Sequence, residues 1–142
     1  MSEPHAGRCL CGAVRYEVRG PLRDILVCHC VECRRWAGRA WAATGACVAD
    51  LVIEGPVAWF PSPDSEHHAD RGTCSACGAS IFWRSPDLDR VSVAAGTLDH
   101  PDGLNVAAHI WVEQGAAWEA PPAGVPAYPR GYPADAPALA WH

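Results

Sequence analysis

The chain contains no lysine, and all eleven of its basic residues are arginines. Sixteen acidic residues outnumber them, so the formal net charge at pH 7 is −5. Binding to a phosphate backbone depends on clustered basic side chains. The only local basic cluster is Arg34, Arg35 and Arg39, and three charges suit a small anionic ligand better than a duplex. We therefore expect no nucleic-acid partner.

The sequence also lacks an apolar run long enough to span a bilayer. Residues 1–5 show neither the basic stretch nor the apolar stretch of a secretory signal. We therefore expect a cytoplasmic protein that does not bind membranes. Disulfides are rare in the cytoplasm, so the eight cysteines favour metal binding over the alternative, a disulfide scaffold.

Seven of the eight cysteines lie in close groups. A chain of 142 residues can form one domain whose core needs no metal to fold, so metal binding has to be inferred from the spacing of the thiols. The pairs Cys9/Cys11 and Cys74/Cys77 are each followed by Gly-Ala. Tetrahedral zinc needs sulfurs about 3.8 Å apart, which a tight turn provides. These four thiols predict a structural zinc that links the N-terminal strand to the middle of the chain.

Three further thiols, Cys28, Cys30 and Cys33, lie within six residues of one another. Zinc held by three protein ligands keeps a fourth position for water or substrate, which is typical of catalytic zinc. The fourth ligand can also be a protein group. His29 is a weak candidate, because neighbouring side chains in an extended segment point to opposite faces. We predict a second zinc here, with the three cysteines as catalytic residues.

Arg34 and Arg35 follow these thiols directly. A guanidinium lowers the pKa of a nearby thiol and can hold a carboxylate through two parallel hydrogen bonds. The alternative is that both are solvated surface charges. Cys47 has no partner at ligand spacing, so we expect it in the core, where free cysteines are usually found. We also expect the core to contain three of the tryptophans, Trp59, Trp83 and Trp118.

The pattern of apolar residues indicates a mainly β fold. Residues 14–18 alternate between apolar and charged side chains, as in a half-buried strand. One helical turn is expected over residues 33–37, ended by Gly38. The other predicted strands are residues 25–27, 40–48, 51–54, 57–60, 79–84, 91–95 and 106–112. Short strands separated by turn residues at this spacing predict an all-β domain.

The segment from residue 121 to 142 is rich in Pro and Ala. Such a segment is neither a helix nor a central strand. Tyr128, Tyr132 and Trp141 are candidates for contacts with the rest of the chain, and the alternative is a loosely held end. We divide the chain into a domain of residues 1–120 and a C-terminal tail of residues 121–142.

Together these motifs resemble the glutathione-dependent formaldehyde-activating enzyme family, which includes the domain of centromere protein V. The resemblance covers most of residues 5–120. The matching stretches are Gly7-Arg8-Cys9-Leu10-Cys11-Gly12-Ala13-Val14, Cys28-His29-Cys30-Val31-Glu32-Cys33-Arg34-Arg35, Arg71-Gly72-Thr73-Cys74-Ser75-Ala76-Cys77-Gly78, Gly96-Thr97-Leu98-Asp99, and His109-Ile110-Trp111-Val112 with Trp118 behind it. Thr73 stands where an aromatic residue often precedes the second cysteine pair, and the Pro-rich end has no counterpart.

The resemblance implies a β-tent of twisted antiparallel sheets. It implies a structural zinc on Cys9, Cys11, Cys74 and Cys77, and a second zinc on Cys28, Cys30 and Cys33. The implied activity is the addition of glutathione, or a similar low-mass thiol, to formaldehyde or a related aldehyde, which is a carbon–sulfur lyase-type reaction. Arg34, Arg35 and Arg71 are then the residues that we expect to bind the carboxylates of glutathione.

Two other functions stay open at this point, because thiols add to formaldehyde readily without help. One is a zinc-dependent carrier or sensor that binds the thiol or its adduct without catalysis. The other is an interaction module in which both zinc ions are purely structural. Family membership alone does not decide between them, because one fold serves several functions.

Overall fold

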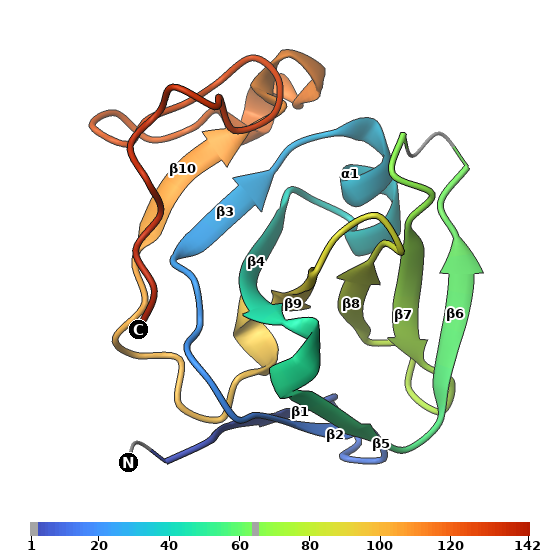
Figure 1. Ribbon diagram of the computed structural model, residues 1–142. Coiled ribbons are helices and arrows are strands. Elements are labelled where there is room, and N and C mark those ends of the chain that lie inside the picture. The colour runs from blue at the N-terminus through green and yellow to red at the C-terminus, as the bar shows by residue number, and fades with distance from the viewer. Residues whose placement is uncertain (1–2, 64–65) are drawn as a thin grey trace.

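The computed structural model describes residues 3–63 and 66–142 (Figure 1). Within these residues the expected mainly β fold is confirmed, with two sheets and a single short α-helix, α1 (Val31–Ala37). The strands are β1 (His5–Arg8), β2 (Arg15–Val18), β3 (Ile25–Cys28), β4 (Trp41–Cys47), β5 (Leu51–Glu54), β6 (Val57–Pro61), β7 (Asp70–Cys74), β8 (Ser80–Arg84), β9 (Arg90–Ala94) and β10 (Val106–Ile110). No helix in these two ranges is long and apolar enough to cross a bilayer.

The smaller sheet has the strand order β1-β2-β5 and is antiparallel. Its central strand shows the predicted alternation, since Tyr16 and Val18 are buried while Arg15 and Glu17 are exposed. The buried side chains meet Phe82 and Val93 of the larger sheet, with the rings of Tyr16 and Phe82 in edge-to-face contact. This packing forms the main hydrophobic core of the described chain. In Figure 1 the small sheet lies at the base of the molecule.

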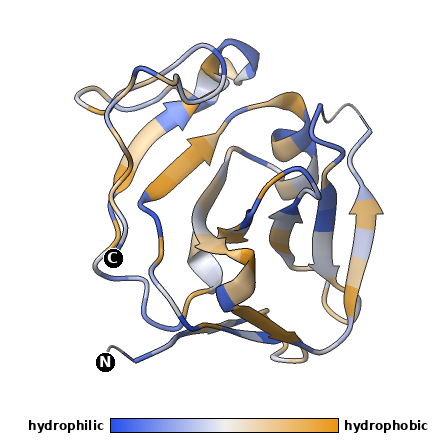
Figure 2. Cartoon of the chain, in the orientation of Figure 1, coloured by the Kyte–Doolittle hydropathy of each residue, from blue (hydrophilic) through white to orange (hydrophobic). Residues whose placement is uncertain are grey.

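The larger sheet has the order β10-β3-β4-β9-β8-β7-β6 and curves so that its two outer strands lie on opposite sides of the molecule (Figure 1). One pair departs from the expected antiparallel arrangement: β10 runs parallel to β3 and has an irregularity between Val106 and Ala108. Strand β3 is among the most apolar segments (Figure 2). A second group of buried residues, which includes Cys33 and Trp41, lies where α1 packs on this sheet.

Helix α1 begins two residues earlier than the sequence predicts. Cys30 caps its first turn, because the Cys30 sulfur accepts a hydrogen bond from the Cys33 amide at 3.3 Å. The helix ends at the predicted residue, where Gly38 adopts a left-handed conformation with φ of 85°. The capping sulfur belongs to the central cysteine group, so the start of the helix and the placement of these thiols are coupled.

The segment of residues 121–142 contains none of the named helices or strands, yet it makes many contacts with the rest of the chain. Its first half lies along β10, with hydrogen bonds from the His109 amide to the Pro126 carbonyl and from the Tyr128 amide to the His109 carbonyl. Its end pairs with residues just before β3, where the amides of Leu22 and His142 each donate to the other's carbonyl. The His142 ring also lies 2.9 Å from a carboxylate oxygen of Asp24.

Candidate metal centres and adjoining cavity

The structure gathers Cys9, Cys11, Cys74 and Cys77 into one group, whose sulfurs all lie within 4.8 Å of one another. The Cys9 and Cys11 sulfurs are 3.7 Å apart, and those of Cys11 and Cys74 are 3.8 Å apart. These distances exceed the length of a disulfide bond, and the eight cysteines are all free thiols. They match the separation of about 3.8 Å that tetrahedral zinc thiolates require. In number and spacing the group therefore fits a metal ion.

In each cysteine pair of this group, a backbone amide donates to the sulfur of the first cysteine. The Val14 amide donates to the Cys9 sulfur at 3.3 Å, and the Cys77 amide donates to the Cys74 sulfur at 3.4 Å. Burial raises the pKa of Cys9, but the Val14 amide and the neighbouring thiols outweigh it and lower the pKa to about 6. Gly12 and Gly78 close the two turns with φ of 81° and 79°, a conformation that favours glycine.

Cys28, Cys30 and Cys33 form a second group, with sulfurs that also lie within 4.8 Å of one another. Cys28 ends β3, Cys30 caps α1 and Cys33 is buried in its first turn. Hydrogen bonds from Cys28 and Cys33 lower the pKa of Cys30, and the charge of Arg71 adds to this effect. Hydrogen bonds with Cys30 and Cys33 raise the pKa of Cys28, and burial and repulsion between neighbouring thiolates add to this effect. Among the described residues this group has three ligands, one fewer than the first group.

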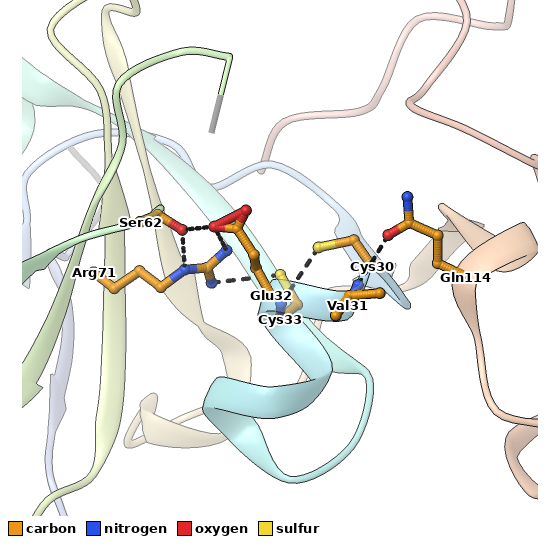
Figure 3. A network of polar contacts seen from close by, with 7 residues as sticks. All are labelled: Cys30, Val31, Glu32, Cys33, Ser62, Arg71 and Gln114. Carbon is orange, nitrogen blue, oxygen red and sulfur yellow. Dashed lines mark hydrogen bonds and ion pairs between the residues drawn. The ribbon is translucent and has the colours of Figure 1, made fainter. Parts of the chain in front are cut away.

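Arg71 of β7 lies against Cys33 of the three-thiol group (Figure 3). Its Nη1 atom donates to the Cys33 sulfur at 3.5 Å, and its Nε atom donates to the Ser62 hydroxyl at 2.8 Å. Glu32 completes the network through a hydrogen bond from Ser62 and a 4.0 Å contact with Arg71 Nη2. The guanidinium also lies 5.1 Å from the centre of the Trp36 ring. The network fixes a positive charge beside the thiols.

A cavity of about 760 Å³ opens beside the three-thiol group. All three cysteines and Arg71 line it, whereas neither Arg34 nor Arg35 does. Arg35 is exposed, and Arg34 is half-buried with an Nε atom that has no hydrogen-bond partner in the described residues. Adjacent helical positions point in different directions, so closeness to Cys33 in sequence does not bring these two side chains to the cavity.

Several cavity residues were not identified as such from the sequence, among them Arg23, Arg90, Trp41 and Tyr132. Trp83 and Trp111 also line the cavity. These residues come from three strands, from the segments before β3 and after β10, and from the C-terminal segment, and no single local motif groups them. His67 also lines the cavity, whereas His68, the next residue in the chain, is exposed.

His29 is not among the potential metal ligands found in the described residues. It is buried, and its Nε2 atom lies 2.8 Å from Nδ1 of His109, which is also buried. Burial lowers the pKa of both rings. The parallel pairing of β10 with β3 creates this contact, because it places Ile110 opposite Cys28.

Two expectations about burial were wrong. Cys47 is exposed because it is the last residue of β4, opposite the exposed Arg90. Trp118 is 73% exposed, in a short 3-10 turn after β10. Trp59 does pack against the main core, and Trp83 packs against the second core while also lining the cavity.

The sequence profile of the family of glutathione-dependent formaldehyde-activating enzymes matches residues 4–114. This range is more than half of the chain, which therefore belongs to that family. Among solved structures, the fold is similar to the crystal structure of a Rhodobacter sphaeroides protein, with 25% sequence identity and a TM-score of 0.53. That similarity covers 70% of this chain and 90% of the other. A search of curated proteins found no match.

Proposed function

We propose that this protein is a zinc-dependent enzyme that promotes addition of a low-mass thiol, glutathione or a similar one, to formaldehyde or a related aldehyde. The observation that carries the proposal is the difference between the two thiol groups. The four-thiol group has the number of ligands that a structural zinc site needs, whereas the three-thiol group opens onto the cavity with one ligand fewer in the part of the chain that the structure describes. Membership of the family supports the choice of thiol and aldehyde.

In the reaction a carbon–sulfur bond forms between the thiol and the carbonyl carbon, and the thiol proton is transferred to the carbonyl oxygen. A zinc ion on Cys28, Cys30 and Cys33 would supply Lewis acidity, which favours ionisation of an incoming thiol near neutral pH. Arg71 holds a fixed positive charge beside Cys33, so it stabilises negative charge that develops on sulfur or oxygen nearby. Trp41 and Trp83 line the cavity and exclude water from one side of the substrate.

The size of the cavity supports a thiol of peptide size. Small-molecule sites usually have volumes of about 300–1,000 Å³, and this cavity has about 760 Å³. Formaldehyde alone would leave most of it empty. We also propose a cytoplasmic setting, where a reducing environment keeps the cysteine thiols free for metal.

The decisive experiment compares the rate of exchange between glutathione, formaldehyde and their adduct with and without the zinc-loaded protein. Magnetisation-transfer NMR measures this rate at equilibrium. We expect an increase proportional to protein concentration, and no increase with C33S. Glutathione binding without any acceleration would contradict the enzyme and support a carrier or sensor. If glutathione does not bind, the remaining function is the interaction module in which both zinc ions are structural.

A further inference from the structure

The cavity contains a second charged region, formed by Arg23 and Arg90. Within the described residues, neither guanidinium has a carboxylate partner among the ion pairs found. Arg23 is only 5% exposed. Its Nε and Nη2 atoms donate to the carbonyls of Asp24 and Ala43, at 3.1 and 3.3 Å. These bonds hold the guanidinium in place without neutralising its charge.

Asp24 and the carboxylates that line the cavity have other partners. The Asp24 carboxylate accepts a hydrogen bond from the Asn105 amide and contacts the His142 ring. Glu66 of the cavity lies 3.5 Å from the His67 ring, and Glu32 bonds to Ser62. Burial and the nearby charge of Arg90 lower the pKa of Arg23 to about 10. Two arginines close enough to repel each other, one of them buried, favour the binding of an anion.

The strand register places this pair away from the thiols. At one end of β4, Trp41 is opposite Cys28 of β3. Four residues further along, Gly45 is opposite Ser92 of β9. The guanidinium of Arg23 lies over Gly45, 3.2 Å from the position that a Cβ would occupy, so a larger residue would displace it. Residues two apart on a strand share a face, and Arg90 therefore lies on the face that carries Ser92.

Four residues of strand correspond to about 13 Å between the thiol end and the arginine end of the cavity. Arginine side chains shorten the gap that a ligand has to bridge. An extended chain of three residues spans up to about 10 Å, whereas the thiol and carboxylate of a single amino acid are much closer together. The cavity therefore matches a peptide-sized thiol whose carboxylate lies far from its sulfur.

We propose that Arg23 and Arg90 form an anion-binding subsite that takes a carboxylate of the thiol substrate at the end of the cavity remote from Cys28, Cys30 and Cys33. This inference rests on the proposed function for the identity of the thiol. The C-terminal segment helps to build the subsite, because Trp141 pairs with Arg23 and Tyr132 lines the cavity. Both residues lie beyond the range that matches the family, so the subsite is in part a feature of this chain.

The test uses S-methylglutathione, which keeps both carboxylates but has no free thiol, and isothermal titration of the zinc-loaded protein. R90Q is the decisive variant, because Arg90 is exposed and its replacement should not affect folding. R19Q removes another exposed arginine, just after β2 of the small sheet, and serves as the control. We expect Kd to rise at least fivefold with R90Q and to stay within twofold with R19Q. R23K, which keeps the charge but loses the fork of donors, should also weaken binding.

The diethyl ester of S-methylglutathione, in which both carboxylates are neutral, separates a charge effect from a general loss of the site. We expect this ester to bind wild type weakly and R90Q equally weakly. A Kd for S-methylglutathione that R90Q leaves unchanged would overturn the subsite, and so would an equal loss with R19Q. If S-methylglutathione binding depends on Arg90 but no acceleration is seen with glutathione and formaldehyde, the subsite stands and the proposed function fails. If the protein accelerates the reaction but S-methylglutathione binding is independent of Arg90, the proposed function stands and the subsite fails.

Discussion

The sulfur of Cys11 lies 3.8 Å from the sulfur of Cys74, although 63 residues separate them in the sequence. Cys11 belongs to the turn between β1 and β2, and Cys74 ends β7 of the other sheet. A metal ion at this position would connect the two sheets at the side of the main core. Because a site of this kind does not exist in the unfolded chain, metal binding there contributes to folding stability.

We therefore expect C74S to lose one of two bound zinc ions and to lower the free energy of unfolding by at least about 3 kcal/mol. Metal analysis and urea unfolding of the purified protein measure the two effects. C47S is the matched control, because Cys47 is an exposed thiol outside both groups, and it should retain both ions and full stability. A C74S protein that keeps two zinc ions would contradict the assignment of this group.

Arg71 contacts Cys33, a residue proposed to bind metal, and its replacement should affect the reaction more than the fold. Residues that orient metal ligands typically change metal affinity or activity by about 10–100-fold when they are mutated. We expect R71M to reduce the catalysed exchange rate and the zinc affinity of the three-thiol group by a factor in this range. The zinc content of the four-thiol group should not change.

R84M is the control for R71M. Arg84 also stacks on a tryptophan, with its guanidinium 3.5 Å from the centre of the Trp59 ring, but it does not line the cavity. If R84M and R71M lower zinc affinity equally, the effect of Arg71 would come from lost packing and not from its contact with the thiol. R71K should recover part of the activity, because it keeps the charge but not the planar set of donors.

Glu119 fixes the chain just after α1. Its carboxylate accepts hydrogen bonds from the Ala40 amide at 2.7 Å and from Arg39 Nε at 2.6 Å. Burial raises the pKa of Glu119, but these hydrogen bonds outweigh it, so the pKa lies below the ordinary value of 4.5. Arg39 is exposed, so most of the stabilisation comes from the bond to the Ala40 amide. We expect E119A to cost about 1–2 kcal/mol of stability at pH 7.

The sign of the pH dependence follows from the lowered pKa. The contribution of Glu119 is complete above the ordinary value of 4.5 and is lost as the pH falls through the lower pKa of the folded state. Urea unfolding should therefore show a constant difference between wild type and E119A from pH 7 to 5, and a shrinking difference in more acidic buffer. E113A, at an exposed ion pair with Arg130, should change stability by less than about 0.5 kcal/mol.

Residues 121–142 cover the outer edge of β10 and supply part of the cavity wall. We propose that residues 1–120 form a domain of their own. We therefore predict that a chain ending at residue 120 still folds and binds two zinc ions. It should unfold at lower urea concentration and bind S-methylglutathione more weakly, because Arg23 loses its pairing with Trp141. A truncated chain that fails to fold would contradict the division, and one with unchanged affinity would contradict the role of the segment in the subsite.

The sequence was informative wherever the deciding contacts are local. The alternation of Tyr16 and Val18 with charged residues defined β2 and its buried face, since a strand has a period of two. The short spacing within each of the pairs Cys9/Cys11 and Cys74/Cys77, and within Cys28, Cys30 and Cys33, brings those sulfurs together locally, whereas the fold brings the two pairs to each other. Gly38 marked the end of α1 because a left-handed conformation is required there.

Only the tertiary structure decided which of the candidate residues surround the thiols. Arg34 and Arg35 are next to Cys33 in the chain but do not line the cavity, whereas Arg71, named from the family resemblance, does. Arg23 and Arg90, which no motif marks, reach the cavity from the segment before β3 and from β9. Likewise, His109 meets His29 only because β10 pairs in parallel with β3. The sequence by itself determined the two sets of thiols and the mainly β fold. The register of the large sheet decided the charges and walls of the cavity, because strands that are distant in the sequence pair only when the whole core packs.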